Sequence, residues 1–251
     1  GHPMRVCFYT LGCKVNLNET GALEQMFRSA GFTIVPEGEE AAVFVVNSCT
    51  VTNFGDQKSR KWLRRAKREN PGAVTVLTGC YPQAFPREAA AVQEADIITG
   101  ARNRAALPQL VRAFSLDHQR VVNIPKHEKG EDFESCSAAD FGVRTRAFLK
   151  IQDGCDNWCS YCIIPAARGP VRSKPMPELQ SELLTLARNG YREIVLTGIN
   201  LSNYGREWGL HLSDAVLAAA ATPGVERIRL GSIEPDLLTP QEIYRLAEGC
   251  G

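Results

Sequence analysis

Residues 43–49 read VFVVNSC, a short apolar run that ends in a cysteine. Two other stretches repeat this arrangement, RVCFYTLGC at residues 5–13 and AVTVLTGC at residues 73–80. Each apolar run predicts a buried β-strand, because it is short, rich in β-branched and aromatic residues, and followed by polar or glycine residues. Three predicted strands therefore each end shortly before a cysteine, namely Cys13, Cys49 and Cys80.

Segments with helical spacing separate these strands, and further apolar runs continue the rhythm. The first helix is predicted over 18–30, with Asn18 as its N-cap and Gly31 as its stop. The other predicted elements are strands at 32–35 and 96–99 and helices at 54–69 and 103–113. This alternation predicts an α/β fold, with an open, mostly parallel sheet and covering helices over residues 4–115.

Residues 116–146 are polar, contain the charged run KHEKGEDFE and show no period, so we interpret them as a linker. Strand and helix signals return over residues 147–251. They are strands at 147–151, 193–197 and 226–230 and helices at 178–189, 213–221 and 240–248. A closed (β/α) barrel takes about eight strand–helix units, so we expect this region to be a partial barrel that is cut short.

Composition narrows the class of protein. Of the 251 residues, 44% are hydrophobic and 23% are charged, which is typical of a packed globular core. The net charge of +1 indicates no particular partner, so nucleic-acid affinity would have to come from a local patch. We see no targeting segment and no apolar run that could cross a bilayer, and we expect a cytoplasmic protein without a membrane partner. In a reducing compartment, its nine cysteines are more often metal ligands or catalytic groups than disulfides.

The three cysteines at strand ends predict a shared metal site. Ligands of open α/β sheets bind at the carboxyl ends of the strands, so Cys13, Cys49 and Cys80 converge there if their strands are neighbours. The alternative is that each cysteine is buried independently and packs as a small hydrophobic side chain.

A second cysteine group occupies residues 155–162, CDNWCSYC, in the loop after the predicted strand 147–151. A structural zinc site uses four protein ligands, whereas this run contains only Cys155, Cys159 and Cys162. Thiolates also hold four-iron clusters, and a cubic cluster held by three thiolates keeps one iron open to a reactant. Zinc with a distant fourth ligand such as His127 is the alternative.

The CxxxCxxC spacing in GCDNWCSYCIIPAARG resembles the signature of radical S-adenosylmethionine enzymes. The stretches TLGCKVNLNET, VNSCTVT, TGCYPQ, LTGINLSNYG and SIEP resemble motifs of the methylthiotransferases within that family. TLGCKVN is most similar to the branch that modifies N6-threonylcarbamoyladenosine beside the tRNA anticodon. The alternatives are the branches acting on isopentenyladenosine in tRNA or on a ribosomal-protein aspartate, and a non-enzymatic iron–sulfur binding module.

The resemblance implies two [4Fe-4S] clusters with different tasks. Cys13, Cys49 and Cys80 would hold an auxiliary cluster that carries the transferred sulfur. Cys155, Cys159 and Cys162 would hold the catalytic cluster that splits S-adenosylmethionine, giving a radical that abstracts hydrogen from C2 of the adenine; a second S-adenosylmethionine supplies the methyl group. The implied cofactor-binding residues are Tyr161, Gly198, Asn200, Ser232 and Glu234.

The resemblance also implies partners: a tRNA substrate and an electron donor such as flavodoxin or ferredoxin. Members of the family continue into a small RNA-binding β-barrel domain, for which we expect no counterpart within residues 147–251.

Residues 57–69, QKSRKWLRRAKRE, predict a helix with a basic face. Such a face can contact phosphates and release counterions, and the alternative is an ordinary solvated surface. The expected RNA-binding residues are Lys58, Arg60, Lys61, Arg64, Arg65 and Arg68. A second cationic set, Arg168, Arg172 and Lys174, is a candidate contact for the substrate or for the carboxylate of S-adenosylmethionine.

Overall fold

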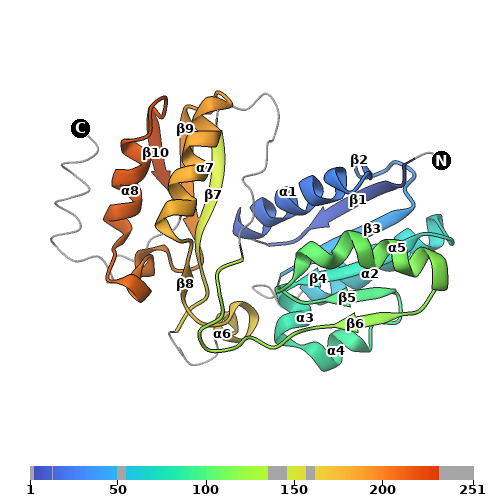
Figure 1. Ribbon diagram of the computed structural model, residues 1–251. Helices are drawn as coiled ribbons and strands as arrows, with labels where there is room; N and C mark the ends of the chain where they lie inside the picture. Colours follow the sequence, from blue (N-terminus) through green and yellow to red (C-terminus); the bar gives the residue numbers. More distant parts are fainter. Residues whose placement is uncertain (1–2, 13, 50–54, 135–145, 157–161, 232–251) are drawn as a thin grey trace. The chain divides into compact units, whose positions relative to one another are not determined.

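The computed structural model describes residues 3–12, 14–49, 55–134, 146–156 and 162–231 (Figure 1). It divides into two compact units. The first contains residues 1–127 and 160–168, and the second contains residues 128–159 and 169–251. The described residues 162–168 therefore fold with the first unit, although a segment of the second unit precedes them in the chain.

The first unit is built on a six-stranded parallel sheet in the order β2-β1-β3-β4-β5-β6. The strands are β1 (Arg5–Thr10), β2 (Thr33–Val35), β3 (Val43–Ser48), β4 (Val74–Gly79), β5 (Ile97–Thr99) and β6 (Val121–Asn123). The chain moves from β1 outward to β2 and then returns to the other side of β1 to form β3. The strand order therefore reverses between β1 and β3, which is the position where sheets of this kind bind ligands.

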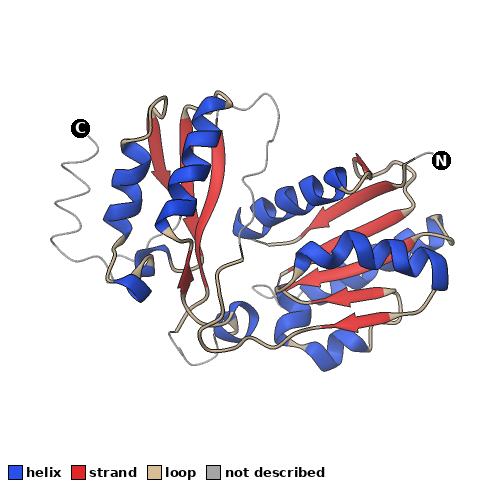
Figure 2. Ribbon diagram, in the orientation of Figure 1, coloured by secondary structure: helices blue, strands red, loops and turns tan. Residues whose placement is uncertain are grey.

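Helices cover both faces of this sheet (Figure 2). They are α1 (Lys14–Ser29), α2 (Gly55–Glu69), α3 (Cys80–Ala84), α4 (Pro86–Ala90), the 3-10 turn η1 (Arg104–Ala106), α5 (Leu107–Asp117) and α6 (Ile164–Arg168). Alternate strand residues face opposite layers. Val45 packs in one core with Phe27 of α1 and Val111 of α5, whereas Val46 packs in another with Leu63 of α2.

The second unit contains a four-stranded sheet in the order β10-β9-β7-β8, in which only β8 pairs antiparallel. Its elements are β7 (Arg146–Asp153), β8 (Arg172–Ser173), α7 (Met176–Arg188), β9 (Glu193–Gly198), η2 (Leu201–Asn203), η3 (Arg206–Trp208), α8 (Leu212–Ala220) and β10 (Arg227–Leu230). Leu183 of α7 and Val216 of α8 share one core with Leu149 and Leu196 of the sheet. The α/β class is therefore confirmed, while the predicted helix 240–248 lies outside the described residues.

Three features of the first unit differ from the sequence prediction. Helix α1 begins at Lys14, so Asn18 lies inside it and is not its N-cap. The predicted linker 116–146 contains β6, which pairs with β5. Helices α3 and α4 were not predicted, because five residues are too few to show a helical period. Within the described residues, no helix has both the length and the apolar character needed to cross a membrane.

Candidate metal centres

Two of the predicted ligands leave the sheet from adjacent strands. Cys49 follows Ser48, the last residue of β3, and Cys80 follows Gly79, the last residue of β4. Ser48 and Gly79 are register partners, so both chains turn away from the sheet at the same level. Both thiols are buried, with 3% and 5% of the residue exposed. We call this edge, with the segment after β1, the cysteine edge.

The segment after β1 reaches the same place. Cys13 lies outside the described residues, but Gly12 has a φ of +103°, and a Cβ there would come closer than 3.0 Å to the Cβ and Sγ of Cys49. Gly79 has a φ of +107°, and its Cβ would lie 2.6 Å from the Ser48 carbonyl oxygen. The condition set by the sequence analysis is met, because β1, β3 and β4 are neighbours in the sheet. Glycine is required where their ends approach.

A buried amide holds these strand ends together. The Asn16 Nδ2 group donates to the carbonyl oxygens of Leu11 at 2.6 Å, and of Asn47 and Ser48 at 3.2 Å each. Asn47 returns a hydrogen bond from its own amide to the Asn16 carbonyl at 3.0 Å. These tertiary hydrogen bonds explain why α1 begins before Asn18 and why Asn16, which sequence reasoning did not select, is fully buried.

A buried carboxylate joins two guanidinium groups beside the cysteine edge. Glu19 Oε1 lies 2.6 Å from Nη1 of Arg168, and Glu19 Oε2 lies 2.9 Å from Nη1 of Arg104. Each of the three side chains, which we call the Glu19 triad, is at most 6% exposed. Helix α6, which ends at Arg168, contacts α3, whose first residue is Cys80. The sequence carried no signal for Arg104, and Glu19 lies in the quoted stretch TLGCKVNLNET but was not selected as a site residue.

These charges act on the Cys80 thiol. Burial raises its pKa from 9.0 to about 11; Arg168 and Arg104 oppose the rise, whereas Glu19 and Cys49 add to it. The metal-free thiol is therefore neutral at physiological pH, and a metal must displace its proton on binding. Among the described residues, which exclude Cys13 and Cys159, no three His, Cys, Asp or Glu side chains are grouped so as to hold a metal ion.

In the second unit, Cys155 lies just after β7. Its backbone N–H donates to the Gly169 carbonyl at 3.0 Å, and its Sγ lies 3.9 Å from the Asn200 Nδ2. The Gln152 side-chain oxygen accepts from the Asn200 backbone N–H at 2.6 Å. A Cβ on Gly198 would lie 2.7 Å from that same oxygen. The structure thus brings Gly198 and Asn200 to Cys155 through Gln152, which sequence reasoning missed.

The structure describes only some of the remaining residues predicted for this second site. Cys159, Tyr161, Ser232 and Glu234 lie outside the described residues, and Cys162 is exposed and falls in the first unit. His127, the alternative zinc ligand, has its Nε2 atom 3.2 Å from the Ala167 carbonyl oxygen.

The second cationic set is held in buried ion pairs. Arg168 belongs to the Glu19 triad, Arg172 pairs with Glu131 and Asp153, and Lys174 pairs with Glu182. Buried pairing of this kind gives these side chains a structural environment, and none of these contacts involves a predicted cofactor-binding residue.

The basic helix α2 presents most of its predicted cations to solvent. Lys58, Lys61, Arg64, Arg65 and Arg68 are exposed, and Arg60 is half-buried. Arg64 pairs with Glu94 and Arg65 with Glu69, which lowers the free positive charge. Three exposed cations have no ion pair with another described residue, and we call them the unpaired α2 cations: Lys58, Lys61 and Arg68.

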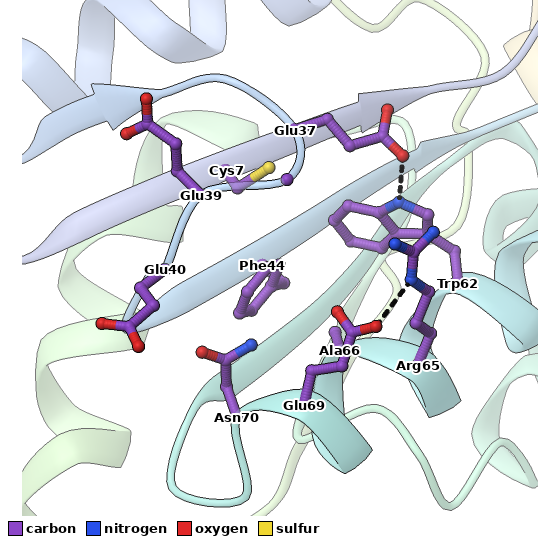
Figure 3. A pocket seen from close by; sticks show the side chains of 11 residues that line it. Cys7, Glu37, Glu39, Glu40, Phe44, Trp62, Arg65, Ala66, Glu69 and Asn70 are labelled. Carbon is purple, nitrogen blue, oxygen red and sulfur yellow. Dashed lines mark hydrogen bonds and ion pairs between the residues drawn. The ribbon is translucent and has the colours of Figure 1, made fainter.

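A surface cavity of about 140 Å³ lies between the β2–β3 loop and α2 (Figure 3). Trp62 donates from Nε1 to Glu37 at 3.1 Å and stacks on Tyr9 with ring centroids 5.0 Å apart. The buried Cys7 thiol also lines this cavity. Burial, followed by the charges of Glu37 and Glu24, raises the pKa of Cys7 to about 11, so this thiol is neutral and inert at physiological pH.

Residues 5–100 match the family described as "Uncharacterized protein family UPF0004". "Threonylcarbamoyladenosine tRNA methylthiotransferase MtaB" of Bacillus subtilis (strain 168) is 41% identical over 95% of this chain and 53% of its own length. The Aquifex aeolicus (strain VF5) protein of the same name is 36% identical over 92% of this chain and 56% of its own length. The chain therefore spans about half the length of the curated relatives it matches.

A solved structure of the radical S-adenosylmethionine methyltransferase TsrM from Kitasatospora setae has a TM-score of 0.56 and 14% sequence identity. The superposition covers 98% of this chain and 65% of the TsrM chain. At 14% sequence identity, this likeness supports the α/β fold alone. The matches to the two curated relatives cover 95% and 92% of this chain. Over nearly its whole length, the chain is thus similar to curated tRNA methylthiotransferases.

Proposed function

We propose that the protein adds a methylthio group to C2 of N6-threonylcarbamoyladenosine in tRNA. The observation that carries the proposal is the cysteine edge. There, the neighbouring strands β1, β3 and β4 end beside the point where the strand order reverses, and Cys49 and Cys80 directly follow β3 and β4. The names of the two relatives with 41% and 36% identity support the substrate.

The residues present fit two iron–sulfur groups. Cys13, Cys49 and Cys80 would hold one [4Fe-4S] cluster, for which the buried thiols of Cys49 and Cys80 and the nearby buried cations are suitable surroundings. Cys155, Cys159 and Cys162 would hold the other. Tyr161, Gly198, Asn200, Ser232 and Glu234 would line the S-adenosylmethionine site. When bound, these groups would supply radical chemistry and the transferred sulfur, and the protein orients them and excludes water.

The protein's own residues have defined tasks in this scheme. Gln152 holds the Asn200 backbone, and the Asn200 amide lies beside the Cys155 sulfur, so the loop after β7 is preorganised for a ligand. The unpaired α2 cations would contact tRNA phosphates, with Arg60, Arg64 and Arg65 nearby. A flavodoxin- or ferredoxin-type protein would supply electrons, and we expect the reaction to take place in the cytoplasm.

The test compares two matched triple variants after anaerobic reconstitution. Cys13→Ala/Cys49→Ala/Cys80→Ala and Cys155→Ala/Cys159→Ala/Cys162→Ala should each retain about four irons per chain, against about eight in the wild type. The wild type, given S-adenosylmethionine, reductant and sulfide, should convert threonylcarbamoyladenosine tRNA to its 2-methylthio form by mass spectrometry.

Other outcomes separate the alternatives. Modification of isopentenyladenosine tRNA or of a ribosomal-protein aspartate would replace the proposed substrate. Iron binding without cleavage of S-adenosylmethionine would indicate a non-enzymatic iron–sulfur module. Stoichiometric zinc in place of iron would refute the proposal.

A further inference from the structure

We propose that Arg104 and Arg168 form a buried cationic seat that positions and holds an anionic metal–sulfur group at the cysteine edge. The inference rests on the proposed function, because it takes a thiolate-held metal group at Cys49 and Cys80 as its ligand. It gives a role to Arg104, which lies in no quoted motif. It also gives Arg168 a different ligand from the substrate or S-adenosylmethionine expected from the sequence.

A single side chain, that of Asn16, connects Arg168 to the backbone next to Cys49. Arg168 Nη2 is 3.5 Å from the Asn16 Oδ1, and the Asn16 Nδ2 is 3.2 Å from the Ser48 carbonyl oxygen, directly before Cys49. Helix α6 contacts α3, which opens with Cys80, and η1, which opens with Arg104, contacts α1. Helix α6 therefore lies against the helix that begins with Cys80, and the charges of both Arg168 and Arg104 act on the Cys80 thiol.

Arg104 has donors that the described protein does not use. Its Nε, Nη1 and Nη2 atoms are buried and have no hydrogen-bond partner among the described residues. The Glu19 carboxylate is close, but its geometry gives Arg104 an ion pair and no hydrogen bond. A guanidinium group carries five N–H donors in a fixed fork. Buried unused donors at a predicted ligand site indicate that the missing acceptor belongs to the ligand.

The charges of the Glu19 triad also favour an anion. One carboxylate and two guanidinium groups sum to a single positive charge, and all three are buried. Buried positive charge is costly unless an anion accompanies it. A metal–sulfur group held by three thiolates is anionic, and its sulfur atoms accept hydrogen bonds that help set its reduction potential.

The experiment uses the Cys155→Ala/Cys159→Ala/Cys162→Ala protein, reconstituted with iron and sulfide, so that only the cysteine edge carries a group. Arg104→Gln and Arg168→Gln should each lose iron to a chelator at least tenfold faster than this parent. Their midpoint potentials should also be more negative than that of the parent. A nearby cation stabilises the reduced group, which carries more negative charge, and each variant removes one such cation. Arg104→Lys should restore part of both properties.

Arg5→Gln is the matched control, since Arg5 forms an exposed pair with Glu39 at the opposite end of β1. It should leave both properties unchanged. The melting temperature of the metal-free protein separates a seat from a structural role. Arg104→Gln should leave that temperature unchanged or higher, because it removes a buried charge whose anion is absent.

Three results would count against the seat. Unaltered iron loss and potential in both glutamine variants would overturn it. Equal destabilisation of metal-free and loaded protein would assign the arginines to structure alone. If the parent itself takes up no iron, the proposed function fails at this edge, and the inference fails with it.

Discussion

Replacing Gly12 with alanine tests the close approach of the segment after β1 to Cys49. The backbone there has a φ of +103°, and an added Cβ would come within 3.0 Å of two Cys49 side-chain atoms. Strained backbone costs about 1–3 kcal/mol, and overpacking of a filled site adds about 1–3 kcal/mol. We therefore expect the variant to lose roughly 2–6 kcal/mol of unfolding free energy, a large part of the stability of a typical domain.

The matched control is Gly38→Ala. Gly38 has a φ of +97°, but a Cβ there would meet no atom within 4 Å. This variant should therefore lose only the unfolding free energy that the backbone strain costs. Urea unfolding of the metal-free proteins, followed by circular dichroism, should show the Gly12 variant less stable than the Gly38 variant by about 1–3 kcal/mol, the contact contribution.

Equal losses in the two variants would refute the close approach of Gly12 to Cys49. A second experiment removes the obstructing Cys49 atoms. In Gly12→Ala/Cys49→Gly, the part of the unfolding free energy lost to the contact should return, whereas the part lost to backbone strain should not. Failure to recover stability in this double variant would show that the clash lies elsewhere.

Three further predictions concern other parts of the first unit. Asn16→Ala should lower the free energy of unfolding in urea by about 1–3 kcal/mol, because it removes the amide that donates to three buried or half-buried carbonyl groups. Asn18→Ala should be neutral or stabilising, because the buried Asn18 amide has no hydrogen-bond partner in the described part of the chain. Replacing the unpaired α2 cations by glutamine should reduce the slope of log tRNA affinity against log salt by about two to three, and a slope equal to that of the wild type would exclude this surface. The pKa of Cys7 is raised to about 11 from 9.0, so its contribution to stability is complete below pH 9 and is lost as pH rises toward 11; the urea midpoint should fall more steeply for wild type than for Cys7→Ala across that range, and parallel curves would contradict this.

The fold of the first unit could be predicted because its sequence signals are local. Runs such as VFVV at 43–46 and the helical spacing in 54–69 reflect burial on one face, which depends on neighbouring residues alone. The positions of Cys49 and Cys80 after their strands followed from the same signals, and the sheet order brought them together. Whether β1, β3 and β4 are neighbours could not be predicted from the sequence, because strand order depends on contacts between residues that are distant in the chain.

The surroundings of the cysteine edge could not be predicted for the same reason. Asn18 has the composition of an N-cap, but hydrogen bonds from Asn16 to the ends of β1 and β3 move the helix start to Lys14. Arg104 carries no motif, and its role depends on a carboxylate 85 positions earlier, at Glu19. Five-residue helices such as α3 are set by packing, since so few residues have little intrinsic helix stability.

The Glu19–Arg168 pair joins residues that are 149 positions apart in the chain. A ribosome extends a chain by about 5–20 residues per second, so α6 emerges roughly 2–8 seconds after residue 127, while the sheet of the first unit is already available to fold. During that interval α3 is not yet covered by α6, and the Cys80 end of the sheet is open on that side. The order of synthesis therefore leaves the Cys80 end of the sheet open on that side until α6 has been made.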